Sequence, residues 1–269
     1  MELSKVLYIS QEIDPYVNPS HIAVTCRLVP QSLQESGIEV RTFMPKYGCI
    51  NERRNQLHEV IRLSGMNIVI DDTDHPLLIK VATLQPARMQ VYFIDNDDYF
   101  HHRAATDMET VNDPDNNGDR MIFFGRGVVE TLRKLRWYPA VIQCSGWITS
   151  LNPLYAKTKY ADDPAFKSAK IVLSLFADDF EGKLDDRLKA KLMQEKLPAA
   201  ALASLPDTAP GYLDLMRLAI DHADAIVEAQ EGVNEEVLAY ASASGKPMLR
   251  LADIGDNTAE AYTAFYKSL

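Results

Sequence analysis

Polar side chains follow the first predicted strand, where a small-molecule ligand would bind. Residues 5–10 (KVLYIS) are an apolar run typical of a buried strand, residues 11–20 read as a loop, and residues 21–36 as a helix. In open α/β folds a ligand commonly sits past the carboxyl end of such a strand, with phosphate near the start of the following helix. Glu12 is the first charged side chain after this strand, and the loop contains neither the glycine nor the lysine of a usual phosphate-binding turn.

A second polar group follows the predicted strand at residues 141–144. Ser145 carries a hydroxyl that can donate a hydrogen bond to a ligand. We expect a crevice between residues 12–22 and 144–149, because the carboxyl ends of parallel strands meet at one edge of the sheet. Ile148, Phe176 and His21 either fill that crevice or leave it open to a ligand.

Other patterns that suggest chemistry are incomplete. Residues 113–118 (DPDNNG) copy the first half of a calcium loop, but the twelfth position, normally a bidentate glutamate, is Phe124. His101 and His102 point to opposite faces if they lie on a strand, and no third ligand is near them in sequence. The acidic run at residues 178–181 predicts a solvated turn. We expect no metal, no cofactor and no catalytic residue.

The pattern of elements predicts a Rossmann-like α/β fold, with a mostly parallel sheet and helices on both faces. Three runs at residues 66–70, 77–83 and 89–94 are too close for crossover helices and predict a small β meander insertion. Further strands are predicted at residues 40–44, 170–176, 225–228 and 248–251. Further helices are predicted at residues 118–135, 150–159, 184–203 with a break at Pro198, 212–222, 232–242 and 257–267.

The composition is typical of a soluble globular protein with one large domain or two small ones, and the alternation of strands and helices predicts one continuous domain over residues 1–269. The chain has 269 residues, 46% of them hydrophobic and 25% charged. Its net charge of -10 disfavours nucleic acid or an anionic membrane as a partner. The sequence lacks a membrane-spanning run and a signal-peptide pattern, so a cytoplasmic location is expected. Three cysteines without C-x-x-C spacing predict reduced thiols.

The segments named above are similar to the amino-terminal domain of bacterial glycogen synthases and plant starch synthases. In that family a strand and an S-E-x-x-P turn run into K-T-G-G-L-A-D-V, whose lysine and glycines hold the phosphates of a nucleotide sugar. The lysine, threonine, glycine, glycine and aspartate positions are occupied here by Asn18, Pro19, Ser20, His21 and Val24. Matching runs lie at residues 6–15, 28–30, 37–41, 44–48, 91–100 and 117–126.

Two further segments keep the family's framework and lose its polar residues. Residues 137–155 resemble W-x-P-D-x-x-H-x-H-D-W-H-x-x-L-x-P-x-Y, with tryptophans, prolines and tyrosine retained. The three histidines and the second aspartate of that pattern are replaced, by Gln143, Ser145, Ile148 and Gly146. Residues 171–182 resemble T-x-H-N-x-x-Y-Q-G, with Phe176 and Ala177 at the histidine and asparagine positions. An aliphatic side chain such as Ile148 cannot supply a proton near neutral pH.

The resemblance implies one half of a GT-B glycosyltransferase, without the second domain that carries much of the nucleotide-sugar site. Glu12 and Tyr99 occupy positions near the family's sugar-binding crevice. Together with the crevice residues above, they give a set of candidate substrate-binding residues: Glu12, Asn18, His21, Tyr99, Ser145 and Trp147.

These observations favour a non-catalytic relative that acts as a binding or interaction module for a glucan or a protein partner, with the oligomeric state open. The alternative is a glucosyltransferase that uses ADP-glucose or UDP-glucose and a second domain supplied in trans. A third reading is recruitment of the fold to an unrelated small-molecule reaction, since fold does not imply function.

Overall fold

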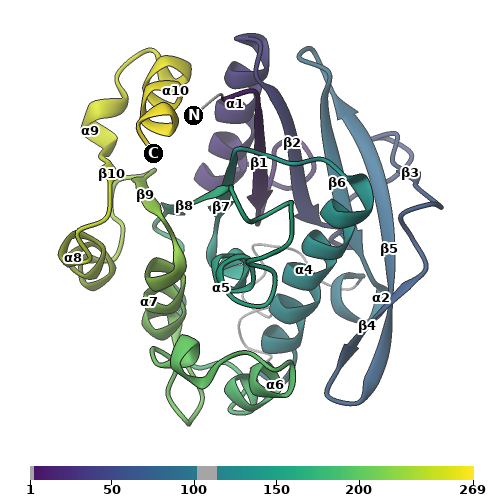
Figure 1. Ribbon diagram of the computed structural model, residues 1–269. Helices are drawn as coiled ribbons and strands as arrows, with labels where there is room; N and C mark the ends of the chain where they lie inside the picture. The colour runs from purple at the N-terminus through teal and green to yellow at the C-terminus, as the bar shows by residue number, and fades with distance from the viewer. Residues whose placement is uncertain (1–2, 102–113) are drawn as a thin grey trace.

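A mixed β-sheet runs through the centre of the molecule (Figure 1). The computed structural model describes residues 3–101 and 114–269. Within these residues the sheet has ten strands in the order β10-β9-β8-β7-β1-β2-β6-β5-β3, with β4 paired to β5. The strands are β1 Lys5–Ser10, β2 Glu39–Pro45, β3 His58–Glu59, β4 Met66–Ile70, β5 Thr73–Leu84, β6 Met89–Asp95, β7 Val141–Ser145, β8 Lys170–Leu175, β9 Ala225–Glu228 and β10 Met248–Leu249.

The predicted mostly parallel sheet with a β meander is confirmed. β1 pairs in parallel with β2 on one side and with β7 on the other. The chain runs outward through β2 and then returns to β7, so the strand order reverses between β1 and β7. A ligand crevice of an α/β sheet lies at such a reversal. The antiparallel part comprises β3, β4, β5 and β6, and β6 pairs in parallel with β2.

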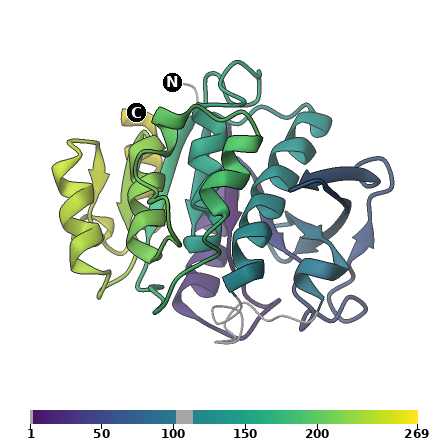
Figure 2. The same cartoon turned by 90° about the horizontal axis from the view of Figure 1, so that it is seen from below.

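Helices cover both faces of this sheet (Figures 1 and 2). α4, α5 and α7 lie side by side on one face, and α1 and α10 pack together on the other. The helices are α1 His21–Glu35, α2 Asp97–Phe100, α4 Pro114–Leu135, α5 Leu151–Lys157, α6 Leu188–Gln194, α7 Tyr212–His222, α8 Glu235–Ala243, α9 Leu251–Ile254 and α10 Thr258–Ser268, with 3-10 turns at Trp147–Thr149 and Ala199–Leu202.

The last helix is tied into the sheet by a buried chain of hydrogen bonds. On α10, the Tyr266 hydroxyl lies 2.8 Å from the Tyr8 hydroxyl of β1 and donates to Gln143 Oε1 of β7 at 2.8 Å. The Gln143 amide nitrogen donates in turn to the Ser174 hydroxyl of β8. Gln143, at one of the family's histidine positions, is therefore an interior residue that joins the central strands to α10.

The predicted long helix at residues 184–203 is wrong. Only α6 is α-helical there, and a 3-10 turn follows it. Lys196 has a φ of 64°, which no right-handed helix accommodates, and Pro198 has no backbone N–H to continue the ladder. The short helix α9 was not predicted. No helix among the described residues is long and apolar enough to cross a membrane.

Candidate functional site

The crevice at the reversal point is occupied by the side chain of Gln11. The backbone N–H of Gln11 donates to the carbonyl of Ser145 at 2.9 Å, and the side-chain Oε1 of Gln11 accepts from the Ile148 backbone N–H at 3.3 Å. Gly146 has a φ of 92°, and a Cβ atom added there would lie 2.5 Å from the Cβ of Gln11. Gln11 thus fills the space between the ends of β1 and β7. Sequence reasoning missed this residue, whose position between a strand end and the E-x-x-P motif was the available signal.

Glu12 lies beside Gln11 and is turned inward. It is 2% exposed, and its carboxylate accepts a hydrogen bond from the Ser20 hydroxyl. Burial raises the pKa of Glu12. The Ser20 oxygen also accepts from the Ala23 N–H at 3.0 Å, which caps the start of α1. The polar groups of this turn are therefore used by the protein itself.

Asn18 and His21 stand at the mouth of the crevice and are exposed. The His21 ring lies edge-on to Phe176 with 6.3 Å between ring centroids, and Nδ1 is 3.4 Å from the Thr25 hydroxyl. Phe176 is 1% exposed and Ile148 is 2% exposed. These two apolar side chains pack into the interior next to Gln11, while His21 remains at the surface.

Ser145 and Trp147 are buried at the end of β7. The Trp147 N–H donates to Asp178 Oδ2 at 2.8 Å, and its indole meets the Phe180 ring edge-on at 5.2 Å. Asp178 follows β8 and also accepts from the Tyr212 hydroxyl at 2.6 Å. The predicted solvated turn is therefore wrong at Asp178, which is half-buried and joins three elements. No sequence pattern singled out this carboxylate.

Tyr99 lies apart from these groups. Its hydroxyl is 2.9 Å from His75 Nε2 on β5, and its ring packs 5.2 Å from Phe123 on α4. The structure brings Glu12, Ser145 and Trp147 to one edge of the sheet, with Asn18 and His21 at the mouth, and places Tyr99 in a separate cluster. Of the earlier motifs, His102 and Asp113 lie outside the described residues. Among the residues described, no group of three metal-ligating side chains lies together.

Asp178 should make stability depend on pH. Burial raises the pKa of its carboxyl to about 6, above an unfolded value of about 3.9. Because the folded-state pKa is raised, its stabilising contribution is present below about pH 4 and lost as the pH rises through 6. We expect wild type to lose up to about 3 kcal/mol between pH 4 and 7 relative to Asp178→Asn. In that variant the amide oxygen accepts from the Trp147 N–H, and the amide nitrogen donates to the Tyr212 hydroxyl. Urea unfolding at each pH measures this, and parallel profiles of the two proteins would refute it.

Comparison with known proteins agrees with this geometry. A family model described as the starch synthase catalytic domain matches residues 5–249. A glycogen synthase of Chlorobium luteolum is 36% identical over 235 residues, which cover 87% of this chain and 47% of the relative. A glycogen synthase of Chlorobium phaeobacteroides is 40% identical over 194 residues, which cover 72% of this chain and 40% of the relative. This chain spans about half the length of the curated relatives it matches.

A solved structure shares the fold. The catalytic domain of starch synthase IV from Arabidopsis thaliana, bound to ADP and acarbose, superposes with a TM-score of 0.65 at 18% identity. The match covers 82% of this chain and 44% of that one. The α/β arrangement seen here is therefore that of one half of a GT-B glycosyltransferase.

Proposed function

The chain belongs to the starch synthase catalytic domain family, and from that premise we propose that it is a non-catalytic, glycogen synthase-like binding module. The observation that carries this proposal is the state of the crevice between β1 and β7. Gln11 occupies the space between the strand ends, and Glu12 is buried against Ser20. These contacts leave less space, and one carboxylate fewer, for a nucleotide sugar.

The replaced residues support the same conclusion chemically. Transfer of a sugar from a nucleotide diphosphate requires positive charge and backbone amides that stabilise the departing diphosphate. Asn18 and Ser20 stand where the family has its lysine and first glycine, so neither that cation nor the close backbone approach is available. Ile148 offers no proton donor, and Gln143 is committed to Tyr266 and Ser174.

Exposed aliphatic residues on α1 favour a protein partner over a glucan at this helix. Val24 and Leu28 lie one turn apart on α1, and Leu28 is 55% exposed. Apolar side chains left at the surface together mark sites of protein contact more often than isolated ones. The predicted contacts through Tyr99 and Trp147 are less suited to this role because both rings are buried.

Turnover assays test the proposal directly. We expect ADP-glucose and UDP-glucose, each supplied with glycogen, to give no transfer above that of the Glu12→Ala variant. The Chlorobium luteolum glycogen synthase, assayed in parallel, shows that the conditions support transfer. Glucose incorporation by wild type that Glu12→Ala abolishes would overturn the proposal in favour of an active glucosyltransferase.

A further inference from the structure

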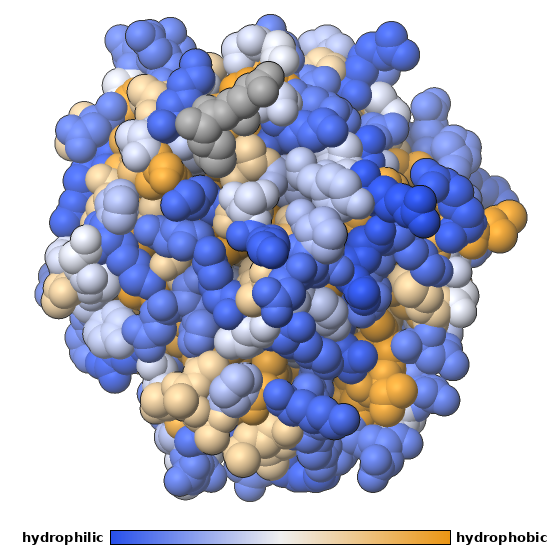
Figure 3. Space-filling view, viewed as in Figure 1, coloured by the Kyte–Doolittle hydropathy of each residue, from blue (hydrophilic) through white to orange (hydrophobic). Residues whose placement is uncertain are grey.

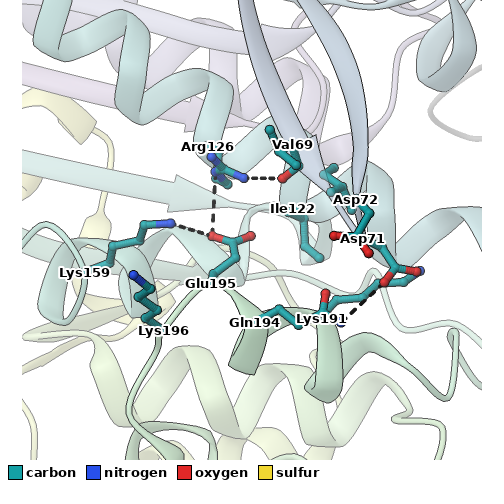
Figure 4. A pocket seen from close by; sticks show the side chains of 11 residues that line it. Val69, Asp71, Asp72, Ile122, Arg126, Lys159, Lys191, Gln194, Glu195 and Lys196 are labelled. Carbon is teal, nitrogen blue, oxygen red and sulfur yellow. Dashed lines mark hydrogen bonds and ion pairs between the residues drawn. The ribbon is translucent and has the colours of Figure 1, made fainter.

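A cavity of about 420 Å³ lies between the β4–β5 turn, α4 and α6, away from the crevice described above (Figure 4). We call it the α4–α6 cavity. Its charged lining includes Arg126, Lys159, Glu195 and Lys196 at one end and Asp71 and Asp72 at the other. Its volume falls in the range of small-molecule sites. None of these residues takes part in the crevice between β1 and β7.

One end of the cavity carries an excess of positive charge. The Glu195 carboxylate, whose side chain is 9% exposed, pairs with Lys159 Nζ at 3.0 Å and lies 3.6 Å from Arg126 Nε. Lys196 stands beside Lys159 at the same end, and none of the described carboxylates pairs with its ammonium. Three cations thus surround one carboxylate, which leaves positive charge available for an anion.

These charged groups are held in place by the surrounding structure. The Tyr155 hydroxyl donates to Glu195 Oε1 at 3.1 Å, and Arg126 donates to the carbonyl of Val69 at 2.6 Å. Lys196 adopts a φ of 64° directly after α6, a conformation that favours glycine over lysine. A long basic side chain at this backbone position is consistent with a role for its charge.

The opposite end offers hydrogen-bond acceptors. Asp71 and Asp72, with φ values of 45° and 66°, form the two-residue turn between β4 and β5, as in a type I′ hairpin. Asp71 is paired with Arg187 at 2.6 Å, whereas Asp72 is exposed and has no ion pair within the described ranges. An ionised carboxylate only accepts hydrogen bonds, so this end suits ligand hydroxyls.

We propose that the α4–α6 cavity binds a small phosphorylated polyol, with the phosphate at Lys159, Lys196 and Arg126 and the hydroxyls toward the β4–β5 turn. The face of the molecule that carries α4 and α5 is predominantly hydrophilic, with apolar areas small and separated (Figure 3). Such a face suits a small polar ligand better than a docked apolar surface. The inference holds whether or not the chain transfers glucose.

Calorimetric titration with three probes tests both ends of the cavity. Glucose 1-phosphate should bind saturably, inorganic phosphate about tenfold more weakly, and glucose without measurable heat. Lys196→Gln should weaken glucose 1-phosphate binding about tenfold, the equivalent of one charge-assisted hydrogen bond. Lys167→Gln, the same change at an exposed lysine outside the cavity, should leave binding unchanged.

A third variant separates the two ends. Asp72→Asn keeps a residue that suits the type I′ turn, so the fold is preserved. It should weaken glucose 1-phosphate binding and leave inorganic phosphate binding unaltered. Absence of saturable binding, or equal effects of Lys196→Gln and Lys167→Gln, would overturn the site. Equal affinity for inorganic phosphate and glucose 1-phosphate would overturn the assignment of a polyol.

Discussion

Tyr266→Ala should destabilise the protein by about 3–5 kcal/mol, the usual cost of removing a fully buried aromatic side chain. Tyr266 is inaccessible to solvent, although it lies only three residues before Leu269. Its loss removes the packing of α10 on β1. It also leaves the Tyr8 hydroxyl and Gln143 Oε1 without their shared partner. Urea unfolding followed by circular dichroism measures the change.

Two further variants identify the source of that loss. Tyr266→Phe keeps the ring and removes the hydroxyl, so we expect a cost of about 1–3 kcal/mol for the unsatisfied buried partners. Tyr138→Phe makes the same change at a side chain that is 49% exposed, and surface changes of this kind usually stay within about 0.5 kcal/mol. A cost below about 1 kcal/mol for Tyr266→Ala would mean that α10 is not part of the cooperative core.

Gly146→Ala should destabilise the protein by about 2–5 kcal/mol. A non-glycine residue at a strained φ costs about 1–3 kcal/mol, and overpacking of a filled interior costs a similar amount. Gly146 has a φ of 92°, and its added Cβ would lie 2.5 Å from the Gln11 Cβ and 2.8 Å from Oε1. Chemical denaturation of the purified variant gives the value.

Gly37→Ala is the matched control for this change. Gly37 has a φ of 95°, but an added Cβ would meet nothing within 4 Å. The difference between the two variants therefore reports the packing of Gln11 in the crevice. In a double-mutant cycle, Gln11→Gly, which removes the Cβ that lies 2.5 Å away, should recover much of that difference. Equal costs for Gly146→Ala and Gly37→Ala would show that the crevice has room to spare.

Much of the fold follows from local sequence patterns. The predicted strands at residues 66–70 and 89–94 match β4 and β6 closely. Short apolar runs between turn residues are too short for helices and therefore indicate strands. The prediction of a helix at residues 184–203 was wrong because it used helix propensity, which does not reveal that Lys196 adopts a left-handed backbone conformation. α9 is only four residues long, and a helix this short leaves too little periodicity to detect.

The location of the candidate site could be predicted from the sequence, but the contacts of its side chains could not. Strand order places the ends of β1 and β7 together, so Glu12 and Ser145 were expected at one edge. The role of Gln11 was not predictable, since its side chain fills the crevice through contacts with Gly146 and Ile148, more than 130 positions away. Asp178 was overlooked because the hydrogen bonds from Trp147 and Tyr212 that fix it are likewise distant in sequence.

The central claim is that the crevice between β1 and β7 no longer accepts a nucleotide sugar. Calorimetric titration with ADP-glucose tests this most directly, and the Lys196→Gln variant, whose α4–α6 cavity should bind phosphate about tenfold more weakly, should be titrated alongside wild type. We predict no saturable heat in the variant and no rise in its melting temperature. Saturable binding of ADP-glucose to Lys196→Gln that a further His21→Ala change abolishes would contradict the account.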